Sequence, residues 1–186
     1  GSLVLLAGNP GTGKTVFSMQ FLYKGAENYG ENGIYVSFAE NEDTIIHNIS
    51  RLFGLDLKNK EEVNGKVKIL DFTTVTEKGL STIMEMVLEE VTVLKAKRLV
   101  IDSFSAMAQA FKEPIEARII IHNILGKLVR QLGCTTILIV EVPTGSEKIG
   151  ISIEEFVADG VIVLKKDSYD GRLIREIEIP KLRGTK

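Results

Sequence analysis

The sequence has 186 residues, of which 44% are hydrophobic and 26% are charged, and its formal net charge is −2. This composition is typical of a globular protein and excludes an intrinsically disordered chain, and the length predicts a single domain over residues 1–186. The small net charge gives no overall attraction to nucleic acid or anionic membranes. One cysteine, Cys134, excludes an internal disulfide and favours a cytoplasmic location. Because no apolar run approaches the roughly 20 residues of a membrane helix, we expect neither a membrane span nor a signal peptide.

Short β-branched runs alternate along the chain with longer helical patterns. In chain order, the pattern predicts a strand at residues 3–7, a helix at 15–29, a strand at 34–38, a helix at 43–53, a strand at 67–72, a helix at 80–94, a strand at 99–101, a helix at 116–132 and a strand at 135–140. Two further strands, 161–165 and 173–179, are joined by a hairpin turn at 167–171. This order predicts an α/β fold with a mainly parallel sheet, helices on both faces and an antiparallel hairpin at one edge.

The segment GNPGTGKT at residues 8–15 matches the phosphate-binding pattern G-x-x-x-x-G-K-[ST] in full, between a predicted strand and a predicted helix. Glycines let backbone N–H groups turn toward an anion, and the helix adds its unpaired N-terminal N–H groups. Lys14 is expected to reach the β- and γ-phosphates, and Thr15 to offer its hydroxyl to Mg²⁺. The sequence therefore predicts ATP or ADP with Mg²⁺ as ligands. The residues predicted to contact them here are Asn9, Pro10, Gly11, Thr12, Gly13, Lys14, Thr15 and Val16.

Two acidic residues follow predicted strands. Asp102 ends the apolar run at 98–101, and beside a phosphate loop this favours a Mg²⁺ role over that of a turn or capping residue. Glu40 follows the second strand, and we predict that it polarises the attacking water. Glu42 and Asp43 remain competing candidates, or cap the next helix.

Taken together, these motifs resemble the RecA-type ATPases, and most closely their KaiC-like branch. The stretches that carry the resemblance are residues 8–15, 35–40, 101–103, 132–136, 154–164 and 181–185. The resemblance implies a three-layer RecA-like core that assembles into a homo-oligomeric ring, with a hexamer expected. It also implies that Lys181, Leu182 and Arg183 approach the nucleotide of a neighbouring subunit, where Arg183 would act as an arginine finger. By the same analogy Phe53 packs on the adenine, although core packing is an equal alternative.

The sequence also departs from that family pattern. Ala39 stands where KaiC-like domains carry the first of two glutamates, which predicts slow hydrolysis. The loop at 142–152 has only Lys148 as a cation, offset by Glu147, so we expect weak nucleic-acid binding at most. The resulting hypothesis is a slow Mg²⁺-dependent ATPase, with catalytic Lys14, Glu40 and Arg183, that drives or times a change in an unidentified protein partner. Open alternatives are a recombinase-like DNA-binding ATPase and a non-hydrolysing nucleotide switch, and autokinase activity also stays open.

Overall fold

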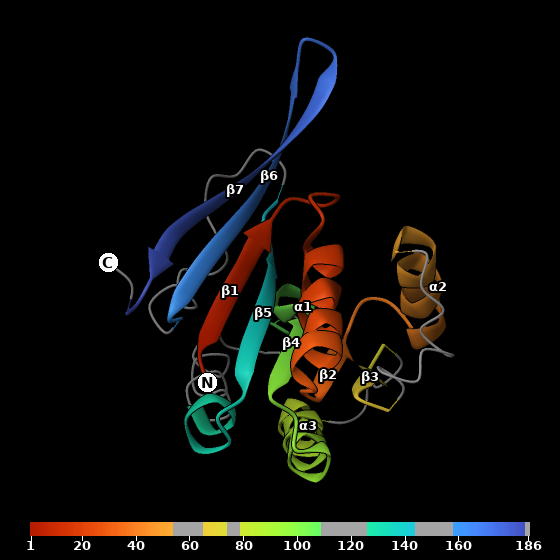
Figure 1. The fold of residues 1–186 in the computed structure, drawn as a ribbon, viewed down its shortest axis with the longest axis vertical. Coiled ribbons are helices and arrows are strands. Elements are labelled where there is room, and N and C mark those ends of the chain that lie inside the picture. The colour runs from red at the N-terminus through yellow and green to blue at the C-terminus, as the bar shows by residue number, and fades with distance from the viewer. Residues whose placement is uncertain (54–64, 74–78, 109–125, 144–157, 185–186) are drawn as a thin grey trace.

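The computed structural model describes residues 1–53, 65–73, 79–108, 126–143 and 158–184, without the side chains of residues 52, 53, 80, 81 and 108. Its centre is a seven-stranded sheet in the order β3-β2-β4-β5-β1-β6-β7 (Figure 1). The strands are β1 (Leu3–Gly8), β2 (Gly33–Ser37), β3 (Val67–Asp71), β4 (Arg98–Asp102), β5 (Thr135–Glu141), β6 (Gly160–Tyr169) and β7 (Arg172–Leu182). All neighbouring strands are parallel except β6 and β7, which form an antiparallel hairpin at one edge. This confirms the predicted α/β architecture.

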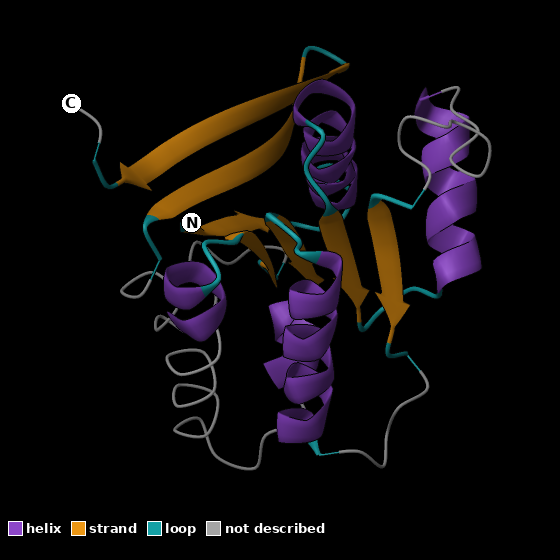
Figure 2. Cartoon of the chain, turned by 60° about the horizontal axis from the view of Figure 1, so that its bottom comes forward, coloured by secondary structure: helices purple, strands orange, loops and turns teal. Residues whose placement is uncertain are grey.

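Helices cover both faces of the sheet (Figure 2). They are α1 (Lys14–Tyr29), α2 (Glu42–Phe53), α3 (Leu80–Leu94), the short α4 (Phe104–Ala108) and a π-helical turn, η2 (Lys127–Gln131). Apolar residues of α1 and α2 pack with Leu6, Val100 and Ile139 on one face. Those of α3, α4 and η2 pack with alternate residues of the same strands on the other face. Strands buried on both faces explain the continuous apolar runs in the sequence. None of the described helices is long and apolar enough to cross a membrane.

The parallel register brings four strand ends to one edge of the sheet. Gly8 at the end of β1 pairs with Glu141 of β5, and Ser37 of β2 pairs with Asp102 of β4. In open α/β sheets, ligands bind outside the carboxyl ends of the strands. This carboxyl edge is therefore where a candidate site has to be sought.

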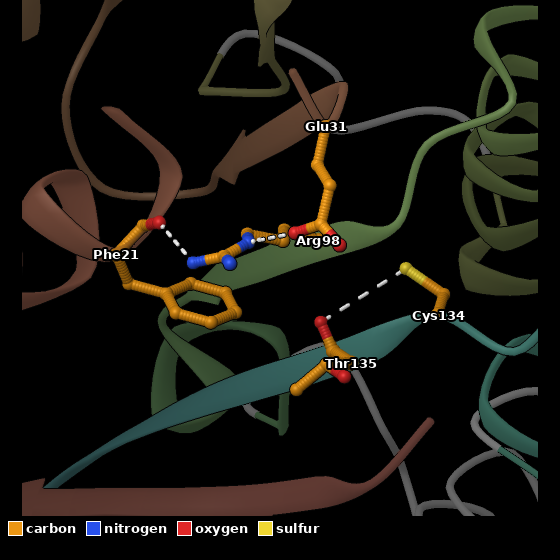
Figure 3. Close-up of polar contacts among 5 residues, drawn as sticks. All are labelled: Phe21, Glu31, Arg98, Cys134 and Thr135. Carbon is orange, nitrogen blue, oxygen red and sulfur yellow. Dashed lines mark hydrogen bonds and ion pairs between the residues drawn. The ribbon is translucent and has the colours of Figure 1, made fainter. Parts of the chain in front are cut away.

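An arginine clamp anchors α1 to the start of β4 (Figure 3). Arg98 donates to the Glu31 carboxylate at 2.6 Å and to the Phe21 carbonyl at 2.8 Å. Its guanidinium also lies over the rings of Phe21 and Tyr29, at 4.7 and 5.3 Å from their centroids. Cation–π contacts and a half-buried ion pair together fix the C-terminal half of α1, the helix that begins in the phosphate loop.

Four elements differ from the sequence expectations. The hairpin strands run longer than 161–165 and 173–179, because the turn is confined to Asp170 and Gly171, both with positive φ, and pairing continues up to it. Helix α4 was not expected, since five residues are too few to show a helical period. Of the expected helix at 116–132, the described part contains η2, and residues 116–125 lie outside the described ranges.

Candidate functional site at the carboxyl edge of the sheet

The phosphate loop joins β1 to α1 at the carboxyl edge, and the backbone geometry requires glycine at two of its positions. Gly13 has φ 104°, in the left-handed region that disfavours other residues, and it immediately precedes α1. A β-carbon on Gly8 would lie 2.5 Å from the Leu164 carbonyl oxygen of β6. No side chain of the described residues caps the N-terminus of α1, and its first turn has no acidic residue. The first N–H groups of the helix therefore remain available to an anion.

Side chains of the phosphate loop hold its shape. The buried Lys14 ammonium donates to the carbonyl oxygens of Gly8 and Asn9 at 2.8 and 3.0 Å. Thr12 Oγ1 donates to the same Asn9 carbonyl at 2.8 Å, and Asn9 Nδ2 donates to the Val142 carbonyl at 2.9 Å. Burial lowers the pKa of Lys14 below its ordinary value, while the carboxylates of Glu141 and Asp102 oppose that shift. The loop thus presents a desolvated cation beside a helix N-terminus.

The structure brings the two predicted metal ligands together. Thr15, in the first turn of α1, donates its hydroxyl to Asp102 Oδ2 at 3.2 Å, across 87 positions of sequence. Burial raises the pKa of Asp102, although hydrogen bonds from Tyr35 and Thr15 and the Lys14 charge act in the opposite direction. An ammonium, a hydroxyl, a carboxylate and free helix N–H groups form a donor set that fits a polyphosphate carrying Mg²⁺.

Tyr35 is a site residue that the sequence did not reveal. Its side chain is fully buried, and its hydroxyl donates to Asp102 Oδ2, the oxygen that also accepts from Thr15. Burial and the neighbouring carboxylate raise the pKa of Tyr35, so the hydroxyl keeps its proton. Tyrosine is common in strands, and nothing in residues 33–37 distinguishes this one.

Glu40 lies three residues beyond the end of β2 and is exposed. Its backbone is tied to Ser37, whose Oγ donates to the Glu40 carbonyl at 2.5 Å and accepts from the Glu40 N–H at 3.1 Å. Glu42 and Asp43 instead form the first turn of α2, which Asn41 caps by accepting the Thr44 N–H at 2.9 Å. Acidic residues at a helix N-terminus have a structural explanation that Glu40 does not share. The water-polarising role of Glu40 stays a prediction.

Glu141 is a further carboxylate of this edge. It ends β5 beside Gly8, and its charge acts on both Lys14 and Asp102. On the other side of the loop is a cavity of about 460 Å³, whose lining includes Asn9, Leu164 and Lys166. A β-carbon on Gly11 would lie 3.8 Å from Lys166 Nζ, so β6 adds a second ammonium near the loop.

Three of the remaining predicted contacts, Lys181, Leu182 and Arg183, do not lie at the phosphate loop of their own chain. Arg183 Nη1 is 3.7 Å from Asp159 Oδ1, and Asp159 Oδ2 accepts the Leu3 N–H at the start of β1. Arg183, with Lys181 and Leu182 before it, is therefore at the amino edge of the sheet, while the loop follows the end of β1. Phe53 ends α2, but its side chain is outside the described part of the structure. Its predicted contact with adenine remains a prediction.

Comparisons with known proteins identify the family of this chain. The sequence pattern of a family described as "ATPase: KaiC" matches residues 1–186. A UPF0273 protein of Pyrococcus horikoshii is 34% identical over 99% of this chain and 78% of its own length. The circadian clock oscillator protein KaiC of Synechococcus elongatus is 35% identical over all of this chain, which spans 37% of that protein.

A solved structure supports the fold directly. The crystal structure of a KaiC-like protein from Pyrococcus horikoshii has a TM-score of 0.85 and 37% identity, covering all of this chain and 81% of that one. Because the family pattern spans the whole sequence and the fold agrees, the chain belongs to the KaiC family of ATPases.

Proposed function

We propose that this domain binds ATP with Mg²⁺ at the carboxyl edge of its sheet and hydrolyses it slowly. The observation that carries the proposal is the contact between Thr15 and Asp102 beside the buried Lys14. A structural turn has no need of a desolvated ammonium next to an uncapped helix N-terminus. A polyphosphate would interact with both the ammonium and the N–H groups at the start of the helix.

Each residue of the site then has a defined part in the reaction. Lys14 and the first N–H groups of α1 bind the phosphates, and Lys14 stabilises negative charge on the transferred group. Thr15 and Asp102 hold the metal ion, which neutralises phosphate charge when it is bound. Glu40 orients a water molecule toward the γ-phosphate and accepts one of its protons, as the water oxygen bonds to the phosphorus and ADP leaves. Since Ala39 stands in place of the first of two adjacent glutamates, we infer slow turnover.

We further propose that the active sites are completed between subunits of a homo-oligomeric ring, for which a hexamer is our working model. Arg183 and the loop lie at opposite edges of one subunit, which supports a contact with the nucleotide of a neighbour. The outer strand supports assembly too, because Leu173, Ile177 and Ile179 of β7 are 51%, 61% and 57% exposed. Exposed apolar side chains grouped on one strand are typical of protein interfaces. Assembly and hydrolysis together would drive or time a change in a protein partner.

The test combines ATP turnover with oligomeric state. Phosphate release is measured with Mg²⁺ and with EDTA, each with and without single-stranded DNA, and mass is measured by light scattering with and without ATP. We expect slow, Mg²⁺-dependent release that DNA does not stimulate, and a larger particle with ATP. Strong stimulation by DNA would favour the recombinase-like alternative. Tight binding without turnover would favour a nucleotide switch, and absence of binding would overturn the proposal.

A further inference from the structure

Strand β2 carries two buried hydroxyl groups on the face that points toward the site. Tyr35 and Ser37 are two positions apart, so their side chains leave the same face of the sheet. Their exposed fractions are 0% and 1%, in a strand whose other residues are Gly33, Ile34 and Val36. A buried hydroxyl costs free energy unless it is hydrogen-bonded, so the partners of these two groups are informative.

The Tyr35 hydroxyl ends a chain of three side chains from three elements. It donates from β2 to Asp102 Oδ2 on β4, and the same oxygen accepts the Thr15 hydroxyl at 3.2 Å from α1. Two donors on one oxygen fix the rotation of the carboxylate. Because Asp102 is partly buried, losing one donor would leave its carboxylate with fewer hydrogen bonds and freer to turn.

The Ser37 hydroxyl acts on the segment that follows β2. It bonds both the carbonyl and the N–H of Glu40, at 2.5 and 3.1 Å, and so closes the bend at residues 38–40. The bend is also held by the Phe38 N–H, which donates to the Asp102 carbonyl at 2.7 Å. Ser37 thereby fixes the position of the Glu40 backbone, from which the exposed side chain extends.

We propose that Tyr35 and Ser37 are the positioning residues of the site, Tyr35 for Asp102 and Ser37 for Glu40. This rests on the proposed function, because it takes the metal role of Asp102 and the water-polarising role of Glu40 from it. The two hydroxyls do different things. Tyr35 supports metal-dependent nucleotide binding, and Ser37 supports the hydrolytic step. Groups that orient metal ligands or catalytic side chains typically contribute about 10- to 100-fold to affinity or activity.

The Tyr35 arm of the test measures binding, and it does not depend on turnover. ADP affinity is measured by calorimetry in EDTA and across a Mg²⁺ titration, for the parent and for Tyr35→Phe. For Tyr35→Phe we expect unchanged ADP affinity in EDTA, which would show that the loop is folded. The Mg²⁺ concentration that gives half of the maximal increase in ADP affinity should be about tenfold higher than for the parent. The matched control is Tyr23→Phe, a buried tyrosine of α1 away from the edge, which should titrate like the parent.

The Ser37 arm separates binding from chemistry. For Ser37→Ala we expect Mg·ATP affinity close to that of the parent, with kcat and kcat/KM both about tenfold lower. Ser37→Thr keeps the hydroxyl and should recover most of the rate. The control is Ser18→Ala, which removes a buried hydroxyl for which the described part of the structure shows no partner, and it should leave the rate unchanged.

The outcomes distinguish this inference from the proposed function. If the parent shows no Mg²⁺-dependent ADP binding, the proposed function fails. If the parent binds but Tyr35→Phe titrates like Tyr23→Phe, the Tyr35 assignment is overturned. If Ser37→Ala turns over like Ser18→Ala, or if Ser37→Ala weakens binding and rate equally, the Ser37 assignment is overturned.

Discussion

Lys14 is a buried ammonium whose hydrogen bonds go to backbone carbonyls of its own loop. Desolvation makes such a charge expensive, and two neutral acceptors compensate it only in part. A polyphosphate would add its negative charge to that of Glu141 and Asp102, in a site of low dielectric where the attraction is strong. At the scale of single residues, the loop is therefore arranged to bind a phosphate.

For Lys14→Ala we predict that ATP binding weakens on the order of 100-fold or more and that turnover is lost, because a buried charged partner of the phosphates is removed. Calorimetric titration with ATP measures the affinity. Lys24→Ala, which removes an exposed lysine paired with Glu27 elsewhere on α1, is the control and should bind like the parent. Parent-like affinity in Lys14→Ala would show that the nucleotide binds elsewhere.

For Glu40→Gln we predict nearly unchanged binding of Mg·ATP and turnover on the order of 10²-fold slower, because a general base acts on the transition state. Single-turnover phosphate release separates the two quantities. Glu42→Gln is the matched control, since Glu42 lies in the first turn of α2. Should Glu40→Gln keep the parental rate, Glu42, or Glu141 at the end of β5, becomes the candidate base.

At the scale of elements, α1 is held at both ends by side chains far away in the sequence. Thr15 reaches Asp102 at one end, and Arg98 clamps the other against Glu31 and two aromatic rings. Gly25 makes room for this clamp, because a β-carbon there would lie 2.3 Å from Arg98 Nε. An isolated helix would favour alanine at such a position by roughly 1 kcal/mol, so the clamp must outweigh helix propensity.

For Gly25→Ala we predict a loss of unfolding free energy of about 1–3 kcal/mol, because the guanidinium has to leave its partners. Urea denaturation followed by circular dichroism measures it. The control is the same substitution in an Arg98→Ala background, where the obstruction is gone and alanine should be neutral or stabilising. Equal losses in both backgrounds would show that the clamp is not the cause.

The elements also show what a sequence can predict here. The phosphate loop could be predicted because its glycines, Lys14 and Thr15 are close together in the chain. The apolar strands could be predicted because burial on both faces produces continuous apolar runs in the sequence. The role of Tyr35 could not be predicted, since it depends on a hydrogen bond to Asp102. That residue is 67 positions away and becomes a neighbour only when β2 pairs with β4. The length of the hairpin likewise depends on cross-strand register, which local composition does not determine.

At the scale of the whole molecule, the sheet separates two functional ends. The phosphate loop follows the carboxyl end of β1, whereas Arg183 bonds with Asp159 beside Leu3 at the start of that strand. The six residues of β1 span about 17 Å at roughly 3.3 Å per residue. An arginine side chain cannot cover that length within one subunit, so Arg183 could serve a nucleotide only across an interface.

We therefore predict that Arg183→Ala lowers turnover while leaving ATP binding to isolated subunits intact, and that mixing it with Lys14→Ala protein restores part of the activity. In mixed assemblies, some interfaces pair an intact loop with an intact Arg183, whose permanent charge and forked geometry suit a γ-phosphate. Phosphate release is measured for each variant alone and for mixtures at constant total protein. The control mixture combines Lys14→Ala with a double variant lacking both Lys14 and Arg183, which offers no intact loop and should stay inactive. In the parent, specific activity should rise with protein concentration as subunits assemble.

A specific activity independent of concentration, together with no rescue on mixing, would show that Arg183 does not act in the site of a neighbouring subunit. The proposed mechanism at subunit interfaces would then be wrong.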